Sequence, residues 1–99
     1  MTIELDGQQY ALRASMLAIQ EAQQKEQLEI AEVTSPVDVS KLLYYFAKHG
    51  AREAGEKFTV SMSGWLDSIQ LDQIGYLTEV LNGLIGVETT EGEGKKKER

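Results

Sequence analysis

Residues Thr2–Leu12 read Thr-Ile-Glu-Leu-Asp-Gly-Gln-Gln-Tyr-Ala-Leu and set the first element of the fold. Apolar residues alternate along both halves of this segment, at Ile3, Leu5, Tyr10 and Leu12. Between them, Asp6-Gly7 supplies two residues that tolerate positive φ, so the pattern predicts a β-hairpin with a short turn. An isolated two-stranded hairpin is only marginally stable in water. We therefore expect its apolar side chains to cover the following helices or a second molecule, which favours an interaction role over catalysis.

The clearest helix of the chain begins at Ser35-Pro36-Val37-Asp38. A serine before a proline at the first helical position, with a carboxylate in the first turn, is typical of a helix N-terminus. One apolar face follows at helical spacing, formed by Val39, Leu42, Leu43 and Phe46. We expect the helix to end at Gly50, because glycine commonly follows the last turn of a helix. Tyr44 and Tyr45 point about 100° apart, so we expect one to be a surface anchor or to lie along the core edge with its hydroxyl in water.

A weaker helix is predicted before it. Ser15 is a suitable N-cap for a helix over Met16–Lys25, whose apolar side would hold Met16, Ile19 and Ala22. Residues Gln20–Glu29 are almost wholly Gln, Glu and Lys. This composition leaves two alternatives open, a solvated continuation of the helix towards Ile30 or a loop.

Two further helices are expected after a polar connector between Gly50 and Lys57. The third helix follows Thr59 and carries Met62, Trp65, Leu66 and Ile69 at helical spacing. The fourth begins at Asp72 as its cap and ends at Gly86, and it buries Ile74, Leu77, Leu81 and Leu84. Because the connection between them is short, we expect them to pack as neighbours. Trp65 is expected to be the largest core side chain, with an exposed binding anchor as the alternative.

Length and composition predict the class of protein. A chain of 99 residues without cysteine suits one domain without disulfides or the usual zinc frameworks, and fits a reducing compartment. It shows neither a signal peptide nor a run of about 20 apolar residues that would cross a membrane, so we expect it in the cytoplasm. We expect a mainly α fold with a small N-terminal β-hairpin (α+β) and about four helices. Residues 1–86 would form this single domain, and residues 87–99 a disordered charged tail.

The charge is divided unevenly along the chain. Residues 1–86 hold 12 acidic and 6 basic side chains, whereas residues 87–99 hold 4 of each sign. An acidic body repels phosphates, and the Lys95–Lys97 run is too short for a basic arm, so nucleic-acid binding is not expected. The acidic excess is consistent with simple solubility or with a specific basic partner.

No catalytic, cofactor or metal site emerges from the residue pattern. His49 is the only histidine, and in the last turn of its helix we expect it to cap the helix or to face solvent. Ser61, Ser63 and Asp67 lie close in sequence without a base to activate a hydroxyl. Asp67 and Asp72 lack the spacing of a metal site. We therefore expect a protein that is not an enzyme.

The order of elements resembles a known family. The hairpin pattern Ile-x-Leu-Asp-Gly-x-x-Tyr-x-Leu, a helix over Met16–Ala22, an acidic connector and the run Asp38–Tyr45 look like the small tail assembly chaperones of long-tailed bacteriophages and gene-transfer particles. The likeness covers residues 2–84. It implies a protein of the host cytoplasm that binds the long tape measure protein, and possibly the tail tube protein, and is absent from the mature virion.

Such a chaperone needs a groove or an apolar face between helices that contacts a partner helix. The residues that we expect to form this surface are Leu43, Tyr44, Trp65 and Tyr76. Two other classes stay open. The first is a structural head–tail or tail subunit that forms a ring, and the second is a small helical adaptor protein. Unpaired hairpin edges also make a homo-oligomer possible by strand addition.

Overall fold

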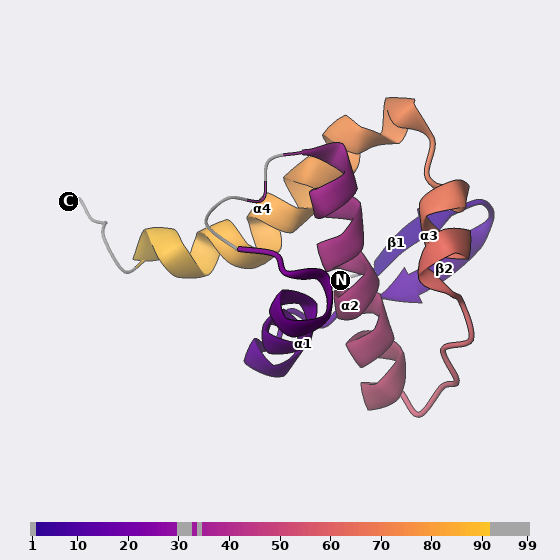
Figure 1. The fold of residues 1–99 in the computed structure, drawn as a ribbon, viewed down its shortest axis with the longest axis horizontal. Helices are drawn as coiled ribbons and strands as arrows, with labels where there is room; N and C mark the ends of the chain where they lie inside the picture. Colours follow the sequence, from indigo (N-terminus) through magenta and orange to yellow (C-terminus); the bar gives the residue numbers. More distant parts are fainter. Residues whose placement is uncertain (1, 30–32, 34, 92–99) are drawn as a thin grey trace.

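Helix α2 (Pro36–Glu53) runs through the middle of the molecule, and the strand and helices around it pack against its sides (Figure 1). This computed structural model describes residues 2–29, 33 and 35–91, with side chains described as far as Ile85. The remaining elements are β1 (Thr2–Leu5), β2 (Gln8–Ala11), α1 (Met16–Glu26), α3 (Met62–Ser68), the 3₁₀ turn η2 (Leu71–Gln73) and α4 (Ile74–Glu91). The predicted class, a mainly α fold with an N-terminal hairpin, is confirmed.

The hairpin has the predicted strands and turn. Strands β1 and β2 are antiparallel, with Ile3 opposite Tyr10 and Leu5 opposite Gln8. Asp6 and Gly7 both have positive φ, 54° and 80°, as a two-residue turn of this twist requires. Ile3 and Leu5 are buried. The hairpin was expected to cover either the helices of this chain or a second molecule. The structure shows that it covers the chain's own helices, because β2 packs against α2.

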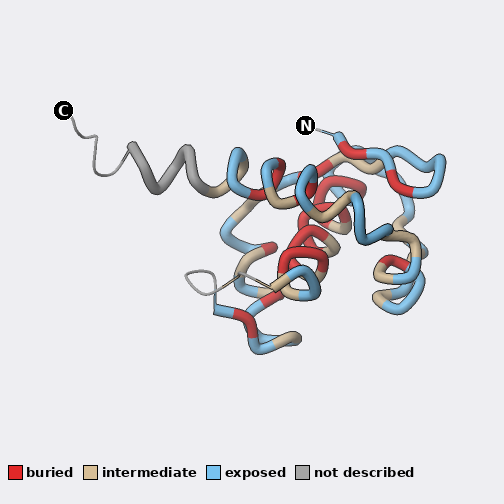
Figure 2. The backbone as a smooth tube through the Cα atoms, turned by 90° about the horizontal axis from the view of Figure 1, so that it is seen from above, coloured by how far each residue is buried: buried red, intermediate tan, exposed pale blue. Residues whose placement is uncertain are grey.

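Helix α2 is buried over most of its length (Figure 2), and ten of its 18 residues are buried. Its start is the predicted one, because Oγ of Ser35 accepts a hydrogen bond from the N–H of Asp38 at 3.1 Å. Its end is later than predicted, at Glu53, so the first part of the expected connector is helical. The N–H of Gly55 (φ 75°) donates to Arg52 and that of Glu56 donates to Ala51, which is a Schellman C-cap.

The prediction that Gly50 ends α2 is wrong, and the reason is a close contact between elements. Gly50 lies inside the helix, where a Cβ atom would come within 2.1 Å of the carbonyl oxygen of Ala11. Glycine at this position therefore lets the end of β2 approach the helix backbone. The N–H of Arg13 then donates to the carbonyl of Phe46 at 3.0 Å, which fixes the chain that leaves the hairpin.

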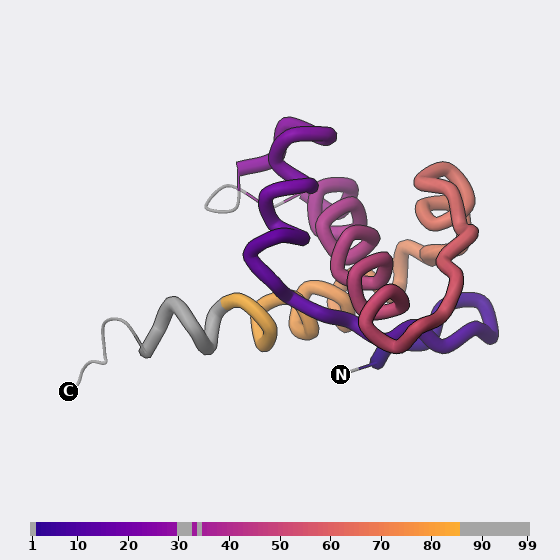
Figure 3. The backbone as a smooth tube through the Cα atoms, turned by 90° about the horizontal axis from the view of Figure 1, so that it is seen from below, coloured from indigo at the N-terminus to yellow at the C-terminus, as the bar shows by residue number. Residues whose placement is uncertain are grey.

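Helices α1 and α3 lie on opposite sides of α2 (Figures 1 and 3). Ser15 caps α1 as predicted, and the helix continues to Glu26 before Gln27 leaves it with a φ of 57°. The expected apolar face is wrong at Met16, which is exposed. Ala22 of the expected face is buried, as is Ala18, which the prediction did not include, and Ile19 is half-buried.

Helices α3 and α4 each make their main contact with α2, so the prediction that they pack on each other as adjacent helices is wrong. Trp65 of α3 is fully buried, as expected of the largest core side chain. Asp72 lies inside η2 and does not cap α4. Gly86 does not end α4, which continues to Glu91. Disorder was predicted for the end of the chain, and residues 92–99 of that segment fall outside the described residues.

The close approach at Gly50 predicts opposite effects for two helix glycines. Gly50→Ala places a methyl group against the Ala11 carbonyl and should destabilise the protein by about 1–3 kcal/mol. The matched control Gly83→Ala lies in α4, where a Cβ meets nothing within 4 Å, and should stabilise it by about 0.5–1 kcal/mol through helix propensity. Urea denaturation followed by circular dichroism measures both. Equal stability of Gly50→Ala and the natural chain would contradict the close contact.

Candidate functional site

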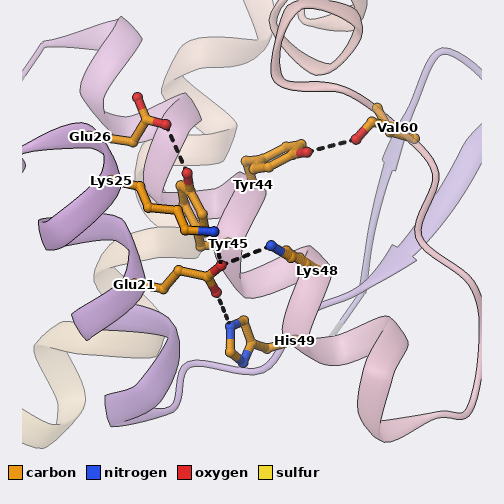
Figure 4. Close-up of polar contacts among 8 residues, drawn as sticks. All are labelled: Glu21, Lys25, Glu26, Tyr44, Tyr45, Lys48, His49 and Val60. Carbon is orange, nitrogen blue, oxygen red and sulfur yellow. Dashed lines mark hydrogen bonds and ion pairs between the residues drawn. The ribbon is translucent and has the colours of Figure 1, made fainter.

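An aromatic cluster joins the hairpin, α2, the segment before α3, and α3 itself. The ring of Trp65 lies 5.0 Å from that of Tyr10 and 5.8 Å from that of Tyr44, and Tyr44 lies 5.3 Å from Phe58. The hydroxyl of Tyr44 donates to the carbonyl of Val60 at 2.7 Å (Figure 4). Edge-to-face contacts of this kind add to the gain from burial, so the cluster fixes the position of α3.

Only one of the four residues predicted to bind a partner is well exposed. Leu43 and Trp65 are 0% exposed, and the indole N–H of Trp65 donates to the Ser40 carbonyl at 2.8 Å. Their expected place on an accessible surface is therefore corrected, because both belong to the core. Tyr44 is half-buried in the aromatic cluster. Tyr76 is 50% exposed on α4 and apart from the other three.

A polar cluster holds α1 on α2 (Figure 4). Glu21 of α1 accepts hydrogen bonds from Nζ of Lys48 at 2.8 Å and from Nε2 of His49 at 2.6 Å. Lys25 forms a further ion pair with Glu21 at 3.1 Å. One turn along, Glu26 accepts a bond from the hydroxyl of Tyr45 at 2.8 Å. Both glutamates of α1 therefore bind groups on α2.

The proton equilibria of this cluster follow from its contacts. Burial alone would raise the pKa of Glu21, but the hydrogen bonds from Lys48, His49 and Lys25 outweigh it and lower the pKa to about 2. Burial raises the pKa of Tyr45, and its hydrogen bond to the Glu26 carboxylate raises that pKa further. At neutral pH Glu21 is charged and Tyr45 is neutral.

The cluster corrects the expectation for His49, which neither caps α2 nor faces solvent. Its side chain is buried and hydrogen-bonded to Glu21. A carboxylate with a pKa of about 2 is a poor proton acceptor at neutral pH. The pair therefore joins α1 to α2 through a carboxylate that is charged at neutral pH. The sequence analysis did not predict the contact between Glu21 and His49, because these residues are far apart in sequence. The spacing of Glu21 and Lys25, which is that of a helical ion pair, was the one local signal of the cluster.

Other polar candidates have local roles. Oγ of Ser61 accepts a hydrogen bond from the N–H of Gly64 at 3.0 Å and so caps α3. Within the described part of the chain, no three His, Cys, Asp or Glu residues come together as metal ligands. In the same part, none of the helices has the length and apolar character needed to cross a membrane.

A half-open hollow of about 500 Å³ lies between β2 and the segment Glu56–Ser61. Tyr10 and Phe58 contribute aromatic walls, and the remainder is mixed, with Gln8, Gln9, Thr59 and Ser61 among the lining residues. This hollow has no concentration of charge of one sign. Its two aromatic lining residues, Tyr10 and Phe58, belong to the aromatic cluster that fixes the position of α3.

Comparison with known proteins finds no family model, curated protein or solved structure that matches this chain.

The low pKa of Glu21 predicts an acid-sensitive contact between α1 and α2. Because the folded-state pKa of about 2 lies below the ordinary 4.5, the stability that Glu21 contributes is complete above pH 4.5 and is lost as the pH falls towards 2. Glu21→Gln should cost about 2 kcal/mol at pH 7, and this cost should shrink as the pH falls through that range. Denaturant titrations at several pH values measure it.

Glu4→Gln is the matched control, because Glu4 is exposed on β1 and its replacement should change stability by less than about 0.5 kcal/mol. A cost of Glu21→Gln that is the same at pH 2.5 and pH 7 would contradict the assignment.

The two tyrosines predicted to bind a partner should behave differently. Tyr44→Ala removes a ring from the aromatic cluster and the bond to Val60, so it should destabilise the fold by about 2–4 kcal/mol. Tyr76→Ala removes a half-exposed side chain and should change stability by less than about 1 kcal/mol. Thermal unfolding of both variants tests this, and similar melting temperatures for the two would show that Tyr44 is not a structural residue.

Proposed function

We propose that this chain is a non-enzymatic tail assembly chaperone of a bacteriophage or related particle. It binds the tape measure protein in the host cytoplasm, keeps it soluble until tail tube subunits polymerise around it, and leaves before the virion is complete. The tail tube protein is a second possible partner. Nucleic acid is not, because the acidic body repels phosphates.

The observation that carries the proposal is that the elements of the resemblance form one folded unit. Ile3 and Leu5 of the hairpin and Leu42 and Leu43 of α2 belong to the same buried core, and β2 packs directly on α2. The sequence likeness to tail assembly chaperones therefore spans residues that fold together. Scattered matches on unrelated segments would carry no such support.

The surface chemistry also supports a binding role. Leu71 is 88% exposed and Tyr76 is 50% exposed, on neighbouring parts of η2 and α4. Single exposed apolar residues are ordinary, but tyrosine is one of the residue types that are enriched where proteins bind their partners. The polar cluster around Glu21, by contrast, joins α1 to α2.

Co-expression with the tape measure protein of the same genome tests the proposal. The tape measure protein should be recovered in the soluble fraction as a complex with this chain and should aggregate when expressed alone. Leu43→Asp is the control, because a charge in the core should unfold the chain and abolish the effect. Mass spectrometry of purified particles should find the tape measure protein without this chain.

Two outcomes would overturn the proposal. A tape measure protein that is equally soluble without the chain would remove the chaperone role. Recovery of the chain as a closed ring within purified particles would instead identify a structural head–tail or tail subunit.

A further inference from the structure

The two halves of the chain differ in how their charges are neutralised. From Phe58 to Gly94 the sequence contains six Asp and Glu residues and no Lys or Arg. In the first half, lysine and arginine side chains pair with carboxylates, as in Lys48–Glu21, Lys41–Glu26 and Arg13–Glu53. Asp67, Asp72 and Glu79 are exposed, and no described residue forms an ion pair with them. The described surface of η2 and α4 therefore carries negative charge that none of the described cations pairs with.

Two of these exposed carboxylates lie on one side of the continuous segment η2–α4, together with an aromatic side chain. Asp72 of η2 and Tyr76 and Glu79 of α4 follow each other at spacings of four and three residues, which places them on the same side of a helix. The packed side, formed by Leu77, Val80 and Leu81, is buried in the core. Leu71, next to Asp72 in the chain, is 88% exposed at the flank of this face. The outer face thus combines the ring of Tyr76 with two carboxylates.

Nothing in the described chain covers this face. A Cβ atom built on Gly75 or on Gly83 meets no atom within 4 Å, and both glycines are exposed. Residues without side chains let a second helix approach an α-helix closely. Because the peptide groups of an α-helix are already hydrogen-bonded within it, the face suits another helix and offers no edge for an added strand.

We propose that this outer face of η2 and α4, formed by Asp72, Tyr76 and Glu79, docks an amphipathic helix of a partner protein. The helix carries Lys or Arg on either side of its apolar stripe. Tyr76 contacts the stripe, and the two carboxylates pair with the flanking cations. Charge complementarity selects this occupant, because an acidic helix, nucleic acid or an anionic membrane surface would be repelled.

The identity of the partner rests on the proposed function, under which the helix belongs to the tape measure protein. The location and chemistry of the surface do not depend on it. They follow from the exposed Tyr76 and from the carboxylates of Asp72 and Glu79, which no described cation pairs with.

The test uses the full chain and two synthetic helical peptides as probes. Each peptide has about 18 residues, or five helical turns, and the same leucine and alanine stripe. One is flanked by lysines and its twin is flanked by glutamates. Titration of the ¹⁵N-labelled chain locates the binding surface, and fluorescence anisotropy measures affinity at low and high salt.

The lysine peptide should shift amide signals of residues 71–83, and the glutamate peptide should bind at least about tenfold more weakly. Tyr76→Ala should weaken the lysine peptide by about tenfold. Asp72→Asn with Glu79→Gln should weaken it by about three- to tenfold and remove most of the salt dependence.

Matched variants outside the face control for nonspecific attraction. Leu17→Ala removes an apolar residue that is 52% exposed on α1, and Glu4→Gln with Glu29→Gln removes two exposed charges elsewhere. Both should leave the affinity for the lysine peptide within about twofold. Shifts that map to another surface, equal binding of the twin peptide, or unchanged affinity of the Tyr76 and Asp72/Glu79 variants would overturn the proposal.

The same variants separate this inference from the proposed function. If the natural chain and Tyr76→Ala keep the tape measure protein equally soluble, the chaperone role stands and the docking face is wrong. If the natural chain does not solubilise the tape measure protein but binds the lysine peptide at residues 71–83, the docking face stands and the chaperone role is wrong.

Discussion

The enclosure of α2 is the constraint on which the rest of the structure depends. Strand β2 and helices α1, α3 and α4 all pack on this one helix, so it has little surface left for solvent. Its small and polar residues then become contact points. Gly50 admits the backbone of Ala11, the carbonyl of Ser40 accepts the indole N–H of Trp65, and His49 bonds to Glu21. Among the described residues, the two buried polar side chains, Ser40 and His49, each form a hydrogen bond, to the Pro36 carbonyl and to Glu21, as burial in a low-dielectric interior favours.

The core and the α1–α2 contact are stabilised by different interactions. Aromatic and aliphatic side chains hold the hairpin, α3 and α4 on α2, whereas α1 buries the two small alanines Ala18 and Ala22 and relies on the carboxylates of Glu21 and Glu26. Hydrogen bonds to charged groups fix orientation well, and their net contribution to stability is modest because both partners lose water. Helix α1 is therefore held in a specific position by the polar contacts of two glutamates, and the contact of Glu21 depends on pH.

Local sequence patterns were sufficient for the hairpin turn at Asp6-Gly7 and for the helix caps at Ser15 and Ser35, because these features depend on residues within one turn of each other. They were insufficient wherever a distant segment decided the outcome. Gly50 was predicted to end a helix, but it lies inside α2 and allows strand β2 to approach the helix backbone. His49 and Tyr44, which look solvent-facing or peripheral in a single helix, bond to Glu21 and to Val60. The exposed residue of the predicted surface, Tyr76, could not be separated from Leu43 and Trp65 by spacing alone.

The burial of Trp65 also limits how any partner can bind. A partner that required the Trp65 side chain would first have to remove it from the core, at a cost of about 3–5 kcal/mol. Since each 1.4 kcal/mol corresponds to about a tenfold change in affinity, that step alone would weaken binding more than about a hundredfold. A partner that contacts the outer side of α4 avoids this cost, because Tyr76 is already in solvent and the packed side of the helix stays in the core. Binding there would leave the enclosed helix α2 undisturbed, and release would require no refolding.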